Sequence, residues 1–195
     1  MFKLDKTSRI LDDQKAEIFH HIVAKLLYVS KRARLDIDLV VSFMCTRVAE
    51  PTEQDWEKLK RLLTYVKGTM DIVRIISAED LTTIRAWADA SYAVHDDMRG
   101  HTGGVISFGV GVTHHKSHKQ KSNAKSSTET EIIRASDYLP WLLWTKRFME
   151  KQGYKISNTT YYQDNESAIR LETNGLKSNS EKTRHIDIRY FLLRT

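Results

Sequence analysis

The chain has 195 residues, of which 41% are hydrophobic and 29% charged, and its formal net charge is +6 at pH 7. This length and composition exclude a largely disordered chain and predict one folded domain with an appendage, while the charge suits a polyanionic partner. The single cysteine, Cys45, excludes an intramolecular disulfide framework and a cysteine-rich zinc site.

The sequence shows no pattern of a membrane span or a secretory signal. No apolar run approaches the roughly 18 residues that a bilayer crossing requires, and the stretch 1–17 carries charges throughout. We therefore expect an intracellular protein without a membrane partner, located in the cytoplasm or the nucleus.

The first part of the chain has helical periodicity. Apolar residues recur at helical spacing over about 18–68, which predicts three helices. The third helix is expected to begin after Pro51 with a capping box and to end at Gly68. The periodicity changes near residue 70, so we expect a helical segment over 1–79 and a second domain over 80–195.

Three strands are predicted to follow. The segments 84–92, 104–108 and 110–115 are rich in β-branched and aromatic residues. Turn-forming residues lie between them at 96–100 and 109–111. These short connections predict antiparallel pairing of consecutive strands.

A long helix, another strand and two further helices complete the predicted order. The long helix spans about 127–152, and Pro140 is expected to kink it because its ring removes one helix hydrogen bond. A strand over 159–164 follows, then a short helix over 166–173 and a final helix from about Arg184. This order predicts an α+β domain, a mixed sheet flanked by helices.

Acidic residues occur at three points of this order. Asp89 lies inside the first strand, Glu129 in the first turn of the long helix, and Asp164 at the end of the fourth strand. A carboxylate within a strand is costly unless a partner such as a metal ion compensates it. If the fourth strand lies beside the first, these residues form a cluster of oxygen donors of the kind that Mg²⁺ prefers.

Each acidic residue also has an ordinary structural interpretation. Glu129 follows Ser126 at the spacing of a capping box, and Asp164 precedes a predicted helix as a cap would. Asp89 on an edge strand would simply face solvent. The coincidence of all three at these topological positions favours the metal cluster.

Several short motifs occur in a fixed order: Leu26-Leu27-Tyr28, Tyr65-Val66-Lys67-Gly68-Thr69, Ala88-Asp89-Ala90-Ser91-Tyr92, His101-Thr102-Gly103-Gly104, Lys116-Ser117-His118-Lys119-Gln120-Lys121, Lys125-Ser126-Ser127-Thr128-Glu129-Thr130-Glu131, Gln163-Asp164-Asn165-Glu166-Ser167-Ala168 and Arg184-His185-Ile186-Asp187-Ile188-Arg189-Tyr190-Phe191. In this order they resemble copia-type LTR retrotransposon Pol polyproteins. The resemblance runs from about residue 18 to the end. It implies the thumb or connection region of a reverse transcriptase followed by a ribonuclease H-like domain, a segment truncated at both ends.

The resemblance also implies an activity. A ribonuclease H domain hydrolyses the RNA strand of an RNA/DNA hybrid with two Mg²⁺ or Mn²⁺ ions roughly 4 Å apart. Asp89, Glu129 and Asp164 match the first three acidic residues of that active site, so they are the expected catalytic and metal-binding residues. A catalytically inactive nucleic-acid-binding remnant is the alternative, and a degenerate reading frame without independent function is another.

Glu131 competes with Glu129 for the second acidic position. We prefer Glu129 because it shares a helix face with the apolar pair 132–133, which is expected to point toward the sheet. Glu131 shares its face with Arg134 and Ala135 instead.

The family pattern places a fourth acidic residue in a last helix, after a fifth strand. The chain stops at Thr195, so we expect both elements to be missing. Asp187 is the remaining candidate for a fourth ligand, although topology assigns it to the preceding helix. His185 is expected to contact substrate or to lie at a helix terminus rather than to act as a catalytic base. The polymerase catalytic core is also missing, so we expect no DNA synthesis. The rest of a Pol polyprotein, in a virus-like particle, is an expected partner.

A basic segment over 113–125 is expected to bind hybrid phosphates, with a solvated loop as the alternative. Its lysines are Lys116, Lys119, Lys121 and Lys125. His114 and His115 point to opposite faces of a strand, which argues against a zinc site. Trp141 and Trp144 are expected to lie in the core of the domain.

Overall fold

The computed structural model describes residues 2–166 and 169. The chain divides into two units, Met1–Arg74 and Ile75–Thr195, whereas the sequence places the boundary between residues 79 and 80. Among the described residues, none of the helices combines the length and the apolar composition needed to cross a membrane.

The first unit contains the three predicted helices. They are α1 (Asp13–Arg32), α2 (Asp38–Cys45) and α3 (Glu53–Gly68), and a short 3₁₀ helix, η1 (Leu35–Ile37), precedes α2. The predicted start of α3 is confirmed, because Thr52 and the third helical residue form a capping box. Such a cap satisfies backbone N–H groups that the first turn leaves without intrahelical partners.

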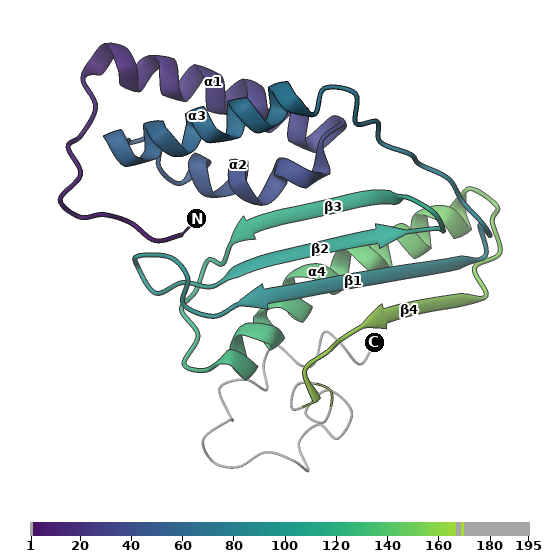
Figure 1. Cartoon of the computed structure of the whole chain (residues 1–195). Coiled ribbons are helices and arrows are strands. Elements are labelled where there is room, and N and C mark those ends of the chain that lie inside the picture. Colours follow the sequence, from purple (N-terminus) through teal and green to yellow (C-terminus); the bar gives the residue numbers. More distant parts are fainter. Residues whose placement is uncertain (1, 167–168, 170–195) are drawn as a thin grey trace. The chain divides into compact units, whose positions relative to one another are not determined.

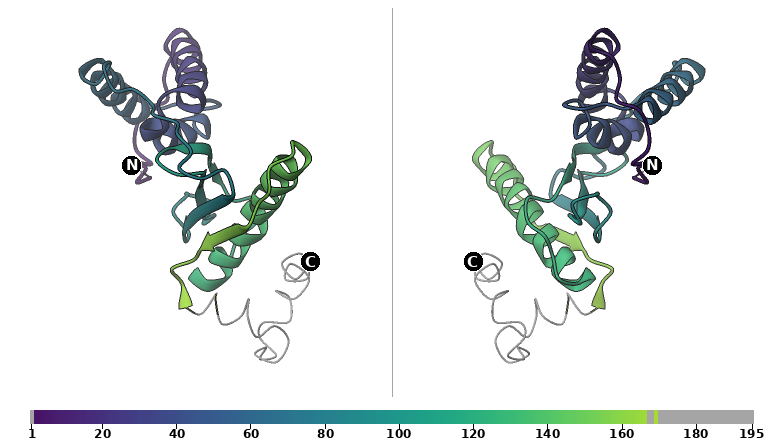
Figure 2. Two further views of the ribbon diagram at one scale, coloured as in Figure 1. Left: turned by 90° about the vertical axis from the view of Figure 1, so that its right-hand side faces the viewer. Right: turned by 90° about the vertical axis from the view of Figure 1, so that its left-hand side faces the viewer.

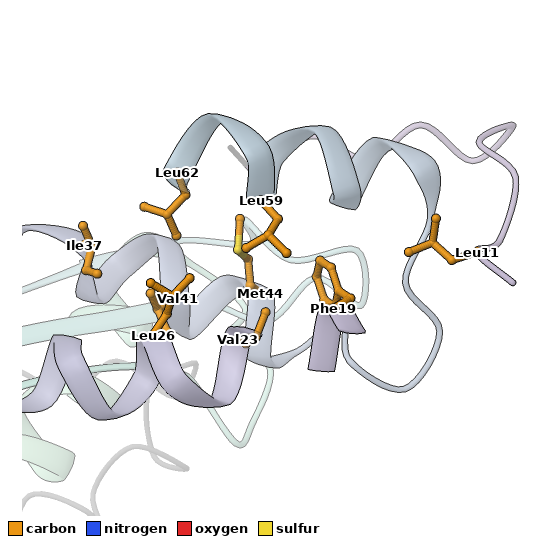
Figure 3. Close-up of a cluster of buried hydrophobic side chains, with 9 residues drawn as sticks. All are labelled: Leu11, Phe19, Val23, Leu26, Ile37, Val41, Met44, Leu59 and Leu62. Carbon is orange, nitrogen blue, oxygen red and sulfur yellow. The ribbon is translucent and has the colours of Figure 1, made fainter. Parts of the chain in front are cut away.

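One apolar cluster holds these helices together (Figure 3). It consists of Leu11, Phe19, Val23, Leu26, Ile37, Val41, Met44, Leu59 and Leu62. Cys45 packs against this cluster, partly buried. The helical spacing of these residues therefore identifies the face of each helix that is buried.

The second unit contains a four-stranded mixed sheet and one long helix (Figure 1). Its elements are β1 (Thr83–Ser91), β2 (His101–Ser107), β3 (Val112–Lys119), α4 (Ser127–Lys151) and β4 (Asn158–Tyr162). The strand order is β3-β2-β1-β4. The two hairpin connections give antiparallel pairs, as predicted, and β4 is parallel to β1, so the fourth strand does lie beside the first.

Helix α4 is the crossover connection between β3 and β4 and packs on one face of the sheet, mainly against β1 (Figure 1, Figure 2). The cluster between helix and sheet comprises Ile84, Ala86, Ile106, Phe108, Tyr138 and Leu142. Fully burying a side chain of this size stabilises a fold by roughly 1.5–3 kcal/mol. The helix lies close to β2 because Gly104 has no side chain: a Cβ there would collide with the ring of Tyr138.

The register between β1 and β4 fixes what lies at their carboxyl ends. Trp87 pairs with Tyr162, and their rings stack with centroids 5.0 Å apart and planes 6° apart. Asp89 and Asp164 each lie two residues beyond this pair. Because the two strands run in the same direction, the register brings both carboxylates to the same edge of the sheet.

One expectation for the second unit is wrong. Trp141 and Trp144 are not core residues, since they are 39% and 58% exposed. The alternative of a solvated loop does not hold for the first half of the basic segment, because β3 continues to Lys119. Of the predicted helix over 166–173 only Glu166 and Ile169 are described, and the expected final helix lies outside the described residues.

Candidate metal centre

Three carboxylates from different elements converge at the carboxyl end of β1. Asp89, Glu131 and Asp164 each offer an oxygen, and these oxygens all lie within 4.8 Å of one another. Asp89 lies on β1, Glu131 in the second turn of α4, and Asp164 two residues after β4. The parallel pairing of β1 with β4 and the packing of α4 on β1 are therefore sufficient to assemble the cluster.

The structure places Glu131, and not the predicted Glu129, beside Asp89 and Asp164. Glu129 is in the first turn of α4, where its Oε2 accepts a hydrogen bond from the Lys125 backbone N–H at 2.7 Å. Glu131 is only 7% exposed and joins Asp89 and Asp164. The physical reason is that Glu131 lies seven residues before Tyr138, two helical turns along the same face, and Tyr138 packs on the sheet.

The environment of Glu131 disfavours its negative charge. Burial raises the pKa of this carboxyl from 4.5 to about 7, against the opposing effect of Arg134. This value also includes the negative charges of Asp89 and Asp164, which raise the pKa, and a hydrogen bond from the Ala90 backbone N–H, which lowers it. A divalent cation among these oxygens would lower the pKa of Glu131 again, because an adjacent positive charge favours the ionised form of the carboxyl.

The other two carboxylates face solvent. The side chain of Asp164 is 80% exposed, and Asp89 is also exposed, with its Oδ1 accepting a hydrogen bond from the Ala90 backbone N–H at 2.7 Å. A cluster with one buried and two exposed carboxylates is anchored in the fold and open to a ligand from outside. Carboxylate oxygens in this arrangement fit hard ions such as Mg²⁺ and Mn²⁺, which complete their coordination with water.

Arg134 is a charged residue of this cluster that the sequence interpretation did not assign to the site. Its fully buried guanidinium places Nη1 2.7 Å from Glu131 Oε2 and 3.9 Å from Asp164 Oδ1. Nη1 also donates to the Ala88 carbonyl oxygen of β1. The signal was available in the sequence, since an arginine three residues after Glu131 on one helix face predicts an ion pair.

The predicted basic segment contributes lysines in different surroundings. Lys119 is paired with Asp97 at 2.7 Å, and the Lys116 ammonium lies 5.4 Å from the centroid of the Trp141 ring. Lys121 and Lys125 follow β3 and are exposed. Two of the four lysines therefore combine exposure with positions between β3 and α4. The candidates His185 and Asp187 lie outside the described residues.

Retrovirus-related Pol polyproteins of plant transposons are similar to most of this chain. The polyprotein from transposon TNT 1-94 of Nicotiana tabacum is 31% identical over 173 residues, which are 88% of this chain and 13% of that protein. The polyprotein from transposon RE2 of Arabidopsis thaliana is 29% identical over 181 residues, 90% of this chain and 12% of that protein. An uncharacterized mitochondrial protein of Arabidopsis thaliana, AtMg00810, is 35% identical over 128 residues, 65% of this chain and 53% of that protein.

These similarities make the chain a homologue of retrotransposon Pol polyproteins. It spans about one eighth of the length of the two polyproteins and about half of the mitochondrial protein. No family model matches the chain, and no solved structure matches it.

Proposed function

We propose that the second unit of this Pol-derived chain is a ribonuclease H-like domain of the copia type, which hydrolyses the RNA strand of RNA/DNA hybrids. The observation that carries the proposal is the convergence of Asp89, Glu131 and Asp164 from β1, α4 and the end of β4. A strand order with one parallel pair beside a hairpin, covered by a crossover helix, supports the assignment of the fold. The similarity to transposon Pol polyproteins supports the biological source.

The three carboxylates would hold two Mg²⁺ or Mn²⁺ ions. Such ions, when bound, lower the pKa of an attacking water and stabilise the charge on a departing 3′ oxygen. Asp89 and Asp164 face solvent and are therefore the residues that a scissile phosphate can approach. Glu131 is held from the protein side by α4 and is the ligand whose position the core fixes most firmly.

The proposed substrate fits the charges around the site. Lys121 and Lys125 are exposed and precede α4, where they can neutralise backbone phosphates. Selection of RNA over DNA would come from contacts with 2′-hydroxyl groups. The rest of a Pol polyprotein is the proposed partner, in cytoplasmic virus-like particles or in the nucleus.

Cleavage of an end-labelled RNA/DNA hybrid in Mg²⁺ or Mn²⁺ tests the proposal. We expect cleavage of the RNA strand alone, abolished by Asp89→Asn and by Glu131→Gln. Glu129→Gln is the matched control, because it makes the same chemical change in the preceding turn, and it should cleave like the wild type. Cleavage that survives Asp89→Asn would contradict the assignment of the cluster as the active site.

The second candidate function is a nucleic-acid-binding remnant without catalysis. The observation in its favour is the Arg134 guanidinium inside the carboxylate cluster, where it supplies a positive charge without a metal ion. This candidate predicts binding of the hybrid that weakens with salt, and no cleavage in either metal. Gel-shift titration at several salt concentrations, run beside the cleavage assay, separates the two functions.

A further inference from the structure

Arg134 occupies the interior of the carboxylate cluster as a permanent cation. Its Nη1 lies within ion-pair distance of two of the three candidate ligands, Glu131 at 2.7 Å and Asp164 at 3.9 Å. A guanidinium remains charged at every pH at which a protein is folded. The oxygens that a divalent cation requires are therefore already in contact with a positive charge.

The guanidinium is also fixed in place. It donates to the Ala88 carbonyl oxygen of β1 and lies over the Tyr161 ring of β4, with its central carbon 6.0 Å from the ring centroid. The whole side chain is buried, and within the described part of the chain its Nε and Nη2 have no hydrogen-bond partner. Among the described residues, the negative groups within 4 Å of this guanidinium are therefore the carboxylates of Glu131 and Asp164.

We infer that Arg134 competes with divalent cations for Glu131 and Asp164, so that the chain holds its own counter-charge where a metal ion would bind. This inference rests on the proposed function, which assigns the carboxylates to metal ions. It goes further in naming a residue that weakens metal binding. A metal ion can enter only if the guanidinium withdraws from the carboxylates, and the repulsion between two cations within about 4 Å costs more than tenfold in affinity.

Mn²⁺ binding by the full chain, measured by calorimetry or by electron paramagnetic resonance of free Mn²⁺, tests the inference. Arg134→Gln removes the charge and keeps a donor for the Ala88 carbonyl, and Arg134→Met keeps apolar volume. We expect both variants to bind Mn²⁺ at least about tenfold more tightly than the wild type. Arg134→Lys keeps the charge and should remain a weak binder.

A double variant identifies the site of the gained binding. Adding Glu131→Gln to Arg134→Gln should abolish it, whereas adding Glu129→Gln should not. Far-ultraviolet circular dichroism of each variant reports folding. If neither neutral variant folds, titration of the wild type with Mg²⁺ decides instead: binding with the Arg134 Nε–Hε resonance unmoved would overturn the inference.

The outcomes distinguish the inference from the proposed function. If the wild-type chain binds Mn²⁺ as tightly as Arg134→Gln, Arg134 does not compete with the metal ion, and the proposed metal centre is still supported. Folded Arg134→Gln and Arg134→Met that bind no Mn²⁺ would refute the metal centre itself, and with it the inference.

Discussion

Replacing Glu131 by glutamine should stabilise the metal-free protein, because the substitution removes a buried negative charge that the fold disfavours. Burial and the carboxylates of Asp89 and Asp164 raise the pKa of Glu131 to about 7 in spite of Arg134. Glutamine has the shape of the protonated side chain and carries no charge. It also retains an oxygen that can accept from Arg134.

The magnitude follows from the raised pKa. A tenfold change in a proton equilibrium corresponds to about 1.4 kcal/mol, so a pKa near 7 in place of 4.5 costs the folded state about 3 kcal/mol when the group is fully ionised. Because the pKa of Glu131 is higher in the folded than in the unfolded state, protonation of this carboxyl stabilises the fold, and this contribution is complete below pH 4.5. It is lost as the pH rises through 7. We therefore expect Glu131→Gln to match the wild type at pH 4 and to exceed it by between about 1 and 3 kcal/mol at pH 8.

Urea unfolding in EDTA, followed by tryptophan fluorescence, measures this difference. The fluorescence reports mainly on the second unit, which contains Trp87, Trp141 and Trp144. Glu129→Gln is the control and should change the free energy of unfolding by less than about 0.5 kcal/mol at either pH. A Glu131→Gln protein that is less stable than the wild type at pH 8 would refute the reasoning. It would show that the ion pair with Arg134 stabilises the fold by more than the burial of Glu131 costs.

Three further perturbations test other parts of the second unit. Burial, reinforced by the charge of Lys119, lowers the pKa of His95. The folded state therefore favours the neutral imidazole, and the stability that His95 contributes at neutral pH is lost as the pH falls. The urea midpoint of His95→Gln should decline less between pH 7 and pH 5 than that of the wild type. Gly104→Ala should destabilise the unit by about 1–3 kcal/mol through overpacking, whereas Gly103→Ala, whose Cβ meets no atom within 4 Å, should cost less in the same urea titration. Replacing Lys121 and Lys125 by alanine should weaken hybrid binding and reduce the magnitude of the slope of log affinity against log salt by about one to two. An unchanged slope would show that these lysines do not contact the phosphates of the hybrid.

The sequence predicts the elements well where apolar spacing and end signals agree. Helix α3 has both, with an apolar stripe, a capping box at Thr52 and an end at Gly68. Strand β3 has neither over its second half, where Lys116 and Lys119 lie opposite Gly104 and His101 of β2. As the outermost strand of the sheet on that side, β3 does not need an apolar residue at alternate positions to be stable.

The site was less predictable than the fold because of how α4 is buried. Consecutive residues from Thr130 to Ala135 are all buried, so the start of the helix has no polar face to contrast with an apolar one. The apolar pair Ile132 and Ile133 therefore misidentified the face that meets the sheet. The reliable signal was further along, where Tyr138 and Leu142 continue the face of Glu131 and pack on β1 and β2.

The charged groups at this site are not the side chains that stability alone would favour. Buried ion pairs can often be replaced by apolar side chains of similar volume without loss of stability. Here Glu131 and Arg134 lie on one helix, Asp89 lies on β1, and Asp164 lies two residues after β4. The proposed function gives these four charges an ion-dependent role. Its two candidate forms, a metal-dependent nuclease and a remnant that binds nucleic acid, differ in whether a divalent cation or Arg134 neutralises the carboxylates.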